Sequence, residues 1–445
     1  MSATVNGILV VYNHPLERNA PTIMEHVDAF ARHSRFRVWS VNTELGFPRS
    51  LGEFDFTTIV LHYSLFGNAP FMLDEYFERY LGRSNAYKIA FFQDEHQFCR
   101  RRFDFVDRYE IDCVYTLLEP REWDRVYRRH TGVPKLVYTI PGYVSDDLVA
   151  RAAAITVPDE RREIDIGYRT RTLPFYMGRG AQEKAEIGRG FVERAHGTGL
   201  RLDIGFDEAS RIYGDAWFDF LANCRGVLGV EAGASIFDLE GFVREESRRL
   251  LAADPDLSIE ELSERLLDRW EDNIYYRTIS PRHFEAAALR VCQILFEGKY
   301  SGILEPMVHY IPLNKDFSNF ADVVDRFADS EVRRTLTENA HRDLIASGVF
   351  SYERFVASFD EELLALGLSP ALDEALAAVV AADLARDRRQ REGAVRLRAA
   401  TLGRPFPGRR ALARAVRPLL GRLRAVYRRW RYRRWERTLE PKAGG

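Results

Sequence analysis

Cysteine is scarce in this chain of 445 residues, which has four copies, at Cys99, Cys113, Cys224 and Cys292. None of them stands in a Cys-x-x-Cys pair, so the pattern fits neither a zinc site nor a disulfide framework. Scattered, reduced thiols are typical of a cytoplasmic protein.

Long hydrophobic runs are also missing. No stretch of 18 apolar residues occurs, so we expect no transmembrane helix. The N-terminus, MSATVNGILVVYN, has no basic region and leads directly into an apolar run. We therefore expect no signal peptide and a cytoplasmic location.

Two common nucleotide-binding motifs are absent. Neither G-x-G-x-x-G nor G-x-x-x-x-G-K-[ST] occurs at a predicted strand–helix junction, which argues against a dinucleotide-dependent oxidoreductase and a P-loop enzyme. No paired Asp motif follows a predicted strand end, so we expect no metal site.

The two charge signs are distributed unevenly. From Arg386 to the end, 20 Lys and Arg residues stand against 4 Asp and Glu residues, whereas the part before Arg386 has 44 against 62. The net charge is therefore +16 in the tail and −18 in the body. This asymmetry predicts that the tail binds an acidic surface.

Apolar runs in the first third of the chain predict a parallel sheet covered on both faces. The runs are 7–12, 36–41, 57–63, 87–92, 113–117 and 136–140, and they alternate with helical patterns at 22–33 and 71–81. We interpret residues 1–150 as a Rossmann-like domain.

The same alternation restarts after a polar linker and predicts a second Rossmann-like domain over 160–365. Its strand-like runs are 164–169, 201–205, 226–230, 291–296 and 308–313. Residues 239–277 interrupt it with a predicted helical insertion that begins one helix with a capping box, Ser258 and Glu261. Two α/β domains of similar size form a cleft that favours ligand binding.

Polar residues follow several first-domain strands, where parallel sheets bind their ligands. Asp94 and Glu95 follow the fourth strand, and His14 follows the first. Each type of side chain can take a proton from an acceptor hydroxyl, so we name all three as candidate catalytic bases. A solvated loop residue or a helix cap is the alternative for each one alone.

A basic, glycine-bearing segment opens the second domain. Arg169 and Arg171 follow its first strand, and Lys184 follows Gly178 and Gly180. Positive charge beside accessible backbone N–H groups suits a diphosphate. A solvated basic loop is an equal alternative. Farther on, the small residues of 227–238 allow close approach of a ligand and add Glu231 to the candidates.

Residues 280–319 carry the most specific pattern. Ser280 and Pro281 suit the N-cap and first position of a helix, which then carries Arg282, His283 and Glu285. Cations in a first turn oppose the helix dipole, so a bound anion would explain them.

This Ser-x-Arg-x-x-Glu helix start resembles the donor site of GT-B-fold glycosyltransferases. The resemblance is nearer to a divergent bacterial group of glycosyl transferases family 1, which includes CgeB-like proteins. It implies that Glu285 contacts the ribose of a nucleotide sugar, that Arg282 and His283 lie near the diphosphate, and that Tyr300 lines the cleft. In retaining GT-B families another Glu precedes by eight positions, where this chain has Arg277, so the stereochemistry stays open.

The tail, 366–445, is predicted to be helical and basic. Over 409–439, apolar residues recur at helical spacing, Arg fills the other face, and Trp430 and Trp435 add aromatic rings. This pattern is typical of a helix on an anionic membrane, and its apolar face favours a membrane over nucleic acid. Docking on the acidic body is the alternative.

The resemblance implies a glycosyltransferase that moves a sugar from a nucleotide sugar to a hydroxyl of a lipid-linked or polymeric glycan, as in polysaccharide biosynthesis. The first domain would bind the acceptor and the second the donor, with no metal and no cofactor beyond the nucleotide-sugar co-substrate. A peripheral position on the inner face of the cell membrane would follow. The alternative is a non-catalytic nucleotide-binding protein that its tail recruits to a membrane or partner.

Overall fold

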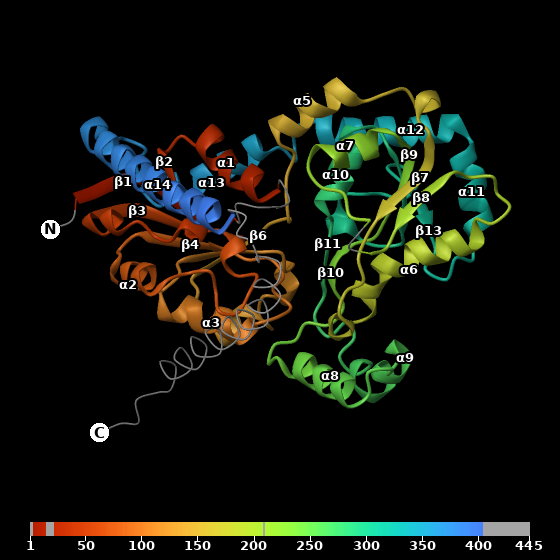
Figure 1. Cartoon of the computed structure of the whole chain (residues 1–445), viewed down its shortest axis with the longest axis horizontal. Coiled ribbons are helices and arrows are strands. Elements are labelled where there is room, and N and C mark those ends of the chain that lie inside the picture. The colour runs from red at the N-terminus through yellow and green to blue at the C-terminus, as the bar shows by residue number, and fades with distance from the viewer. Residues whose placement is uncertain (1–2, 15–21, 208–209, 404–445) are drawn as a thin grey trace.

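The computed structural model describes residues 3–14, 22–207 and 210–403. Its first domain contains a six-stranded parallel sheet in the order β2-β1-β3-β4-β5-β6 (Figure 1). The strands are β1 (Ala3–Tyr12), β2 (Val38–Asn42), β3 (Phe54–Leu61), β4 (Tyr87–Phe91), β5 (Cys113–Thr116) and β6 (Lys135–Tyr138). The helices of this part are α1 (Thr22–His33), α2 (Glu75–Arg83), α3 (Cys99–Arg108) and α4 (Tyr127–His130).

Both faces of the first sheet are buried, because its central strands are continuously apolar. In β1, Leu9 and Val11 belong to the core on one face, and Ile8 and Val10 belong to the core on the other. Alternate side chains of a strand point to opposite faces, so an unbroken apolar run fits only a sheet that is covered on both sides.

The second domain contains a five-stranded parallel sheet in the order β13-β12-β9-β7-β8. Its strands are β7 (Ile164–Arg169), β8 (Leu202–Gly205), β9 (Cys224–Gly229), β12 (Cys292–Phe296) and β13 (Ile311–Leu313). The helices that follow them in sequence are α6 (Arg179–Arg194), α7 (Asp215–Ala222), α10 (Pro281–Ala288), α11 (Phe320–Ala328) and α12 (Ser330–Ala340). The prediction of an α/β protein with two Rossmann-like domains is confirmed.

The strand order of each sheet reverses beside its first strand. In the second sheet, β7 lies between β8 and β9, so the connections that leave β7 and β8 run in opposite directions. Such a reversal opens a crevice at the carboxyl ends of the strands, where ligands bind in doubly wound sheets. The topology thus predicts a ligand site at the carboxyl ends of β7 and β9.

The domain boundaries differ from those expected at residues 150 and 365. Helix α13 (Tyr352–Ala365) returns to the first domain, where Phe355 and Phe359 join the core beneath α1 (Figure 1). Helix α5 (Asp146–Ile155) instead packs through Leu148 and Ala152 on the second domain. Neither helix was located from the sequence, and an amphipathic pattern would not have indicated which domain its apolar face covers.

The helical insertion is present and has its own small core. It consists of α8 (Phe242–Ala253), α9 (Ile259–Leu262) and a π-helical turn (Ser263–Leu267), and the capping box of Ser258 and Glu261 is confirmed. The hairpin strands β10 (Ala232–Ala234) and β11 (Tyr276–Thr278) flank it.

The neck of the insertion lies against the first domain. Phe237, Ile274 and Tyr276 are part of the first-domain core, and the Asp238 N–H donates to the His96 carbonyl at 2.9 Å. The two domains are therefore joined by packed side chains as well as by the linker.

Helix α14 (Glu374–Gly403) begins the tail and docks on the first domain. Ala377 and Val380 enter its core, and the Arg391 guanidinium donates to the carbonyls of Leu45 and Phe47 at 2.7 and 2.8 Å. Among the described helices, none is both long enough and apolar enough to cross a membrane. The predicted amphipathic segment 409–439 lies outside the described residues.

Candidate functional site

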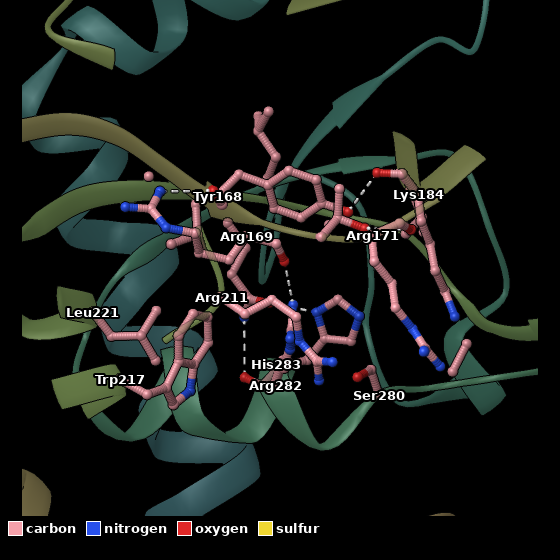
Figure 2. Close-up of a pocket in the computed structure, with 18 of the residues that line it drawn as sticks. Tyr168, Arg169, Arg171, Lys184, Arg211, Trp217, Leu221, Ser280, Arg282 and His283 are labelled. Carbon is pink, nitrogen blue, oxygen red and sulfur yellow. Dashed lines mark hydrogen bonds between the residues drawn. The ribbon is translucent and has the colours of Figure 1, made fainter. Parts of the chain in front are cut away.

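A cavity of about 280 Å³ opens at the strand reversal of the second sheet. Its walls come from the ends of β7 and β9, from α6 and α7, and from the start of α10 (Figure 2). Figure 2 shows Trp217 and Leu221 on one side, Arg171 and Lys184 on the other, and Arg282 with His283 between them. The pocket thus has an apolar end and a cationic end.

The cationic end holds two charged side chains that form no ion pair among the described residues. Arg171 is exposed and Lys184 is half-buried in the pocket wall, and no carboxylate forms an ion pair with either side chain in the part of the chain that the structure describes. Burial lowers the pKa of Lys184, Asp94 opposes this across the cleft, and Arg282 and Arg171 lower it further. Burial and two neighbouring cations all disfavour the charged form of Lys184. A group of cations held together against these effects indicates an anion-binding site.

Arg282 is held at the pocket by two contacts. Its Nη1 donates to the Arg169 carbonyl at 2.6 Å, and its Cζ lies 4.8 Å from the centre of the Trp217 ring. Pro281 at the first helical position starts α10 here and so places Arg282 in the first turn.

Ser280 and His283 also line the pocket. Ser280 is the N-cap of α10, but its side chain makes no capping bond, so its hydroxyl is available to a ligand. His283 is buried, and its Nδ1 lies 2.8 Å from Gln293 Oε1. Burial lowers the pKa of His283 to about 4. The ring is therefore neutral, and it adds no charge to the site.

Glu285 stands behind the pocket wall rather than in it. Its Oε2 accepts a hydrogen bond from Trp217 Nε1 at 2.7 Å, and the residue is not among those that line the cavity. Burial raises the pKa of Glu285, while the Trp217 N–H and Arg282 oppose the rise. The predicted ribose contact is replaced in this structure by a contact with Trp217.

Arg169 is committed to the fold, unlike Arg171. Its Nη2 pairs with Asp203 Oδ1 at 2.8 Å, its Nη1 donates to the Asp203 carbonyl at 2.7 Å, and its Cζ lies 4.3 Å from the centre of the Phe220 ring. Strand pairing between β7 and β8 brings Asp203 beside it. Of the two arginines predicted to act on one diphosphate, only Arg171 is unpaired.

The first N–H groups of α6 are also taken. The Arg179 N–H donates to Glu271 Oε1 at 2.7 Å, and the Gly180 N–H donates to Ser235 Oγ at 2.8 Å. The expected approach of a phosphate to this glycine-bearing backbone is therefore blocked by side chains from the insertion and its neck. Lys184, one turn farther along α6, remains accessible.

Glu231 and Tyr300 lie outside the pocket. Glu231 Oε1 accepts hydrogen bonds from the N–H groups of Lys299 and Tyr300, at 3.1 and 2.9 Å. Tyr300 is fully buried, and its hydroxyl donates to the Phe296 carbonyl at 2.6 Å. Both residues support the loop after β12, where the backbone at Tyr300 and Ser301 is left-handed, so the predicted ligand contacts are corrected to structural ones.

Glu95 is turned into the first domain. Its carboxylate accepts hydrogen bonds from the Thr116 hydroxyl at 2.6 Å, from the Leu117 N–H at 2.8 Å and from the Tyr127 hydroxyl. Burial raises its pKa to about 7 against the effect of these donors. A carboxylate with all these partners inside one domain is not the cleft base that the sequence suggested.

Asp94 faces the second domain. It is exposed, its backbone is left-handed with φ of 51°, and it favours the charged form of Lys184 across the cleft. The left-handed backbone turns Asp94 outward while its neighbour Glu95 points inward.

His14 lies at the end of β1, where the described segment stops. Its N–H donates to Asn42 Oδ1 at 2.9 Å, and its carbonyl accepts from Asn42 Nδ2 at 2.8 Å. These bonds fix the backbone of His14 at the carboxyl edge of the first sheet. No contact of its ring with the second-domain pocket is recorded among the described residues.

Sequence reasoning missed Trp217 and His96. Trp217 is the third residue of α7, and its spacing alone fits any amphipathic helix. His96 is buried where the two domains meet, and neither ring nitrogen has a hydrogen-bond partner; burial lowers its pKa to about 4. The polar cluster after β4 was the available signal for His96. In the described ranges, no group of three or more His, Cys, Asp or Glu side chains could hold a metal ion.

Solved structures similar to this chain include an α-glucosyltransferase and proteins bound to UDP. An α-glucosyltransferase in complex with UDP and DNA aligns over 82% of this chain and 100% of its own, with 11% identity and a TM-score of 0.48. Anabaena Alr3699/HepE in complex with UDP and glucose aligns over 80% and 99%, with 10% identity and a TM-score of 0.44.

TarM aligns over 69% of this chain and 54% of its own, with 11% identity and a TM-score of 0.35. This chain therefore spans about half the length of TarM. No protein-family model matches the sequence, and no curated protein matches it either.

Proposed function

We propose that this chain is a glycosyltransferase that moves a sugar from a nucleotide-sugar donor to a hydroxyl of a lipid-linked or polymeric glycan, without a metal ion. The observation that carries the proposal is the pair of cations, Arg171 and Lys184, at one end of the pocket in the second domain, with Arg282 beside them in the middle of the pocket. A nucleoside diphosphate would supply the negative charge that this end lacks.

The shape of the pocket supports a nucleotide over a simple anion. The end opposite the cations is formed by Trp217, Leu221 and Val227, and apolar and aromatic walls of this kind suit a nucleobase. One ligand with a base at one end and a diphosphate at the other matches both halves. The solved structures named above include complexes with UDP.

In the proposed reaction, the acceptor oxygen bonds to the anomeric carbon of the sugar as the bond from that carbon to the diphosphate oxygen breaks. The electrons of the broken bond go to the diphosphate, where Lys184, Arg171 and Arg282 stabilise the new charge. Asp94 takes the proton of the acceptor hydroxyl, because it is the exposed carboxylate that faces Lys184 across the cleft.

The acceptor class and the location are inferred from the tail. The sequence pattern of 409–439 suits an anionic membrane, which would hold the enzyme beside lipid-linked acceptors on the cytoplasmic side. A chain that ends at 403 keeps the docked part of α14 and removes this segment. The full chain is expected to float with anionic liposomes and the shortened chain is not, and equal flotation of the two would disprove the membrane role.

Two measurements test the enzymatic proposal. Thermal unfolding of the full chain with UDP, GDP, ADP and UMP should show stabilisation by a nucleoside diphosphate and less by the monophosphate. Incubation with nucleotide sugars should then release a nucleoside diphosphate, faster when a glycan acceptor is present. Stabilisation without release from any donor would support the non-catalytic alternative, and stabilisation by no nucleotide would contradict both.

A further inference from the structure

Three side chains of the pocket wall form one connected series. Glu285 Oε2 accepts the hydrogen bond of Trp217 Nε1 at 2.7 Å, and the face of the Trp217 ring lies 4.8 Å from Arg282 Cζ. Arg282 and Glu285 are three residues apart in α10, a spacing that places both on one side of the helix. Trp217, from α7, lies against both of them.

Arg282 needs such support to act on a ligand. It is exposed and has many rotamers, and it sits in the first turn of α10, where the helix dipole repels a cation. The Trp217 ring and the Arg169 carbonyl hold its guanidinium in one place. Only one of its five N–H donors is used by that carbonyl, so the others remain for phosphate oxygens.

Trp217 in turn needs Glu285. The indole N–H is a donor only, and its bond to the Glu285 carboxylate fixes the direction of the ring. Glu285 is half-buried behind the wall and does not line the cavity. The Glu285 carboxylate therefore acts on Arg282 through the Trp217 ring.

We propose that Glu285 is a positioning residue: its carboxylate fixes the Trp217 indole, and the indole holds the Arg282 guanidinium at the diphosphate of the donor. The inference rests on the proposed function, since it requires a diphosphate in the pocket. It differs from the ribose contact that the sequence resemblance implies, because a positioning role acts on the phosphate end of the ligand and is indifferent to the sugar of the nucleoside.

Inorganic pyrophosphate separates the two roles, because it has a diphosphate and no ribose. Its binding and that of UDP are measured by calorimetry on the full chain, wild type and Glu285→Ala. A positioning role predicts that pyrophosphate binding weakens about five- to tenfold, and that UDP binding weakens by at least that factor, because Trp217 also lines the apolar end of the pocket. Unchanged pyrophosphate binding with weaker UDP binding would mean that Glu285 acts on the nucleoside and not on the diphosphate, and would overturn the inference.

Two further variants examine the route through the indole. Glu285→Gln should keep near-normal affinity, because its amide oxygen still accepts the Trp217 N–H. Trp217→Phe removes that donor, so Glu285→Ala should cause no further loss of pyrophosphate affinity in the Trp217→Phe background. Additive losses would mean that Glu285 acts without Trp217.

A spectroscopic measurement keeps this inference distinguishable from the proposed function. The indole ¹H–¹⁵N signal of Trp217, assigned from its loss in Trp217→Phe, should shift in Glu285→Ala while the other tryptophan signals and the melting temperature stay in place. An unmoved signal would overturn the positioning role alone. Failure of the wild type to bind pyrophosphate and every nucleoside diphosphate would overturn the proposed function and this inference with it.

Discussion

The carboxyl edges of the two sheets carry similar polar residues but use them differently. At the first edge, Glu95 has three donors within its own domain, and Asn13 and His62 bond to neighbouring loops. At the second edge, Lys184 and Arg171 have no carboxylate partner in the described chain. Buried His96 at the first edge also lacks hydrogen-bond partners, but burial keeps its ring neutral. Because a cation in a pocket wall normally has a negatively charged partner, the cations at the second edge point to an anionic ligand. This difference favours the second domain as the donor site.

Removal of the Lys184 ammonium should have the largest effect on ligand binding at the second edge. Lys184→Met keeps the length of the side chain and removes its charge, so affinity for a nucleoside diphosphate should fall about 100-fold, or about 2.7 kcal/mol. The melting temperature should hold or rise, since burial already disfavours the charged lysine. Lys135→Met is the control, because Lys135 pairs with Glu362 in the first domain. Calorimetry that gives equal affinities for the two variants would remove Lys184 from the site.

Arg169 and Arg171 are two residues apart, and they differ in the same way: Arg169 is paired within the protein, and Arg171 forms no ion pair in the described chain. Arg169→Ala leaves the Asp203 carboxylate and carbonyl without their partner and should lower the free energy of unfolding by about 2 kcal/mol. Arg171→Ala should leave stability unchanged and weaken diphosphate binding about tenfold. Urea unfolding and calorimetry on both variants check this, and the reverse assignment of effects would show that the ligand rearranges the pocket.

At the first edge, substitution of Glu95 should affect stability, and substitution of Asp94 should affect activity. Glu95→Gln replaces one acceptor oxygen by a donor group among three donors, so unfolding should become easier by about 1–2 kcal/mol. Asp94→Asn keeps a residue that tolerates the left-handed backbone, so its melting temperature should match the wild type while donor-to-acceptor transfer slows. An Asp94→Asn variant with full transfer activity would exclude Asp94 as the base.

The fold was largely predictable because its signals are local. Continuous apolar runs located the strands of both sheets, and Ser258 with Glu261 located a helix start correctly. The return of α13 to the first domain was not predictable, since it depends on packing between residues more than 200 positions apart, such as Phe355 and Phe91. Amphipathic periodicity gives the apolar face of a helix and not its partner.

The candidate site was predictable by region and not by side chain. The basic segment after β7 and the start of α10 do meet at one pocket, which holds Arg171, Lys184 and Arg282. Asp203 removes Arg169 from the set, and Trp217 engages Glu285. Both outcomes depend on a partner that only the tertiary structure supplies, so residue type and spacing could not separate a paired charge from an available one.

Glu25 lies near Glu285 of the second domain. Its substitution should give the smallest effect, a pH-dependent change in the free energy of unfolding. Its pKa is raised to about 7, mainly by burial and next by the Glu285 charge, while the hydrogen bond of Ser145 acts to lower it. Between the ordinary glutamate pKa and pH 7, the folded state holds a proton that the unfolded state has lost, so stability falls as the pH rises through this window. Asp147 and Arg151 also act on Glu25, with opposite signs.

Glu25→Gln removes this penalty, so its gain in unfolding free energy over the wild type should be about 1 kcal/mol larger at pH 8 than at pH 5, after allowance for solvent screening. Urea unfolding at both pH values measures the difference. Glu361→Gln, on the exposed side of α13, should show the same offset at both. A Glu25→Gln gain that is independent of pH would mean that burial and the Glu285 charge do not hold the proton on Glu25.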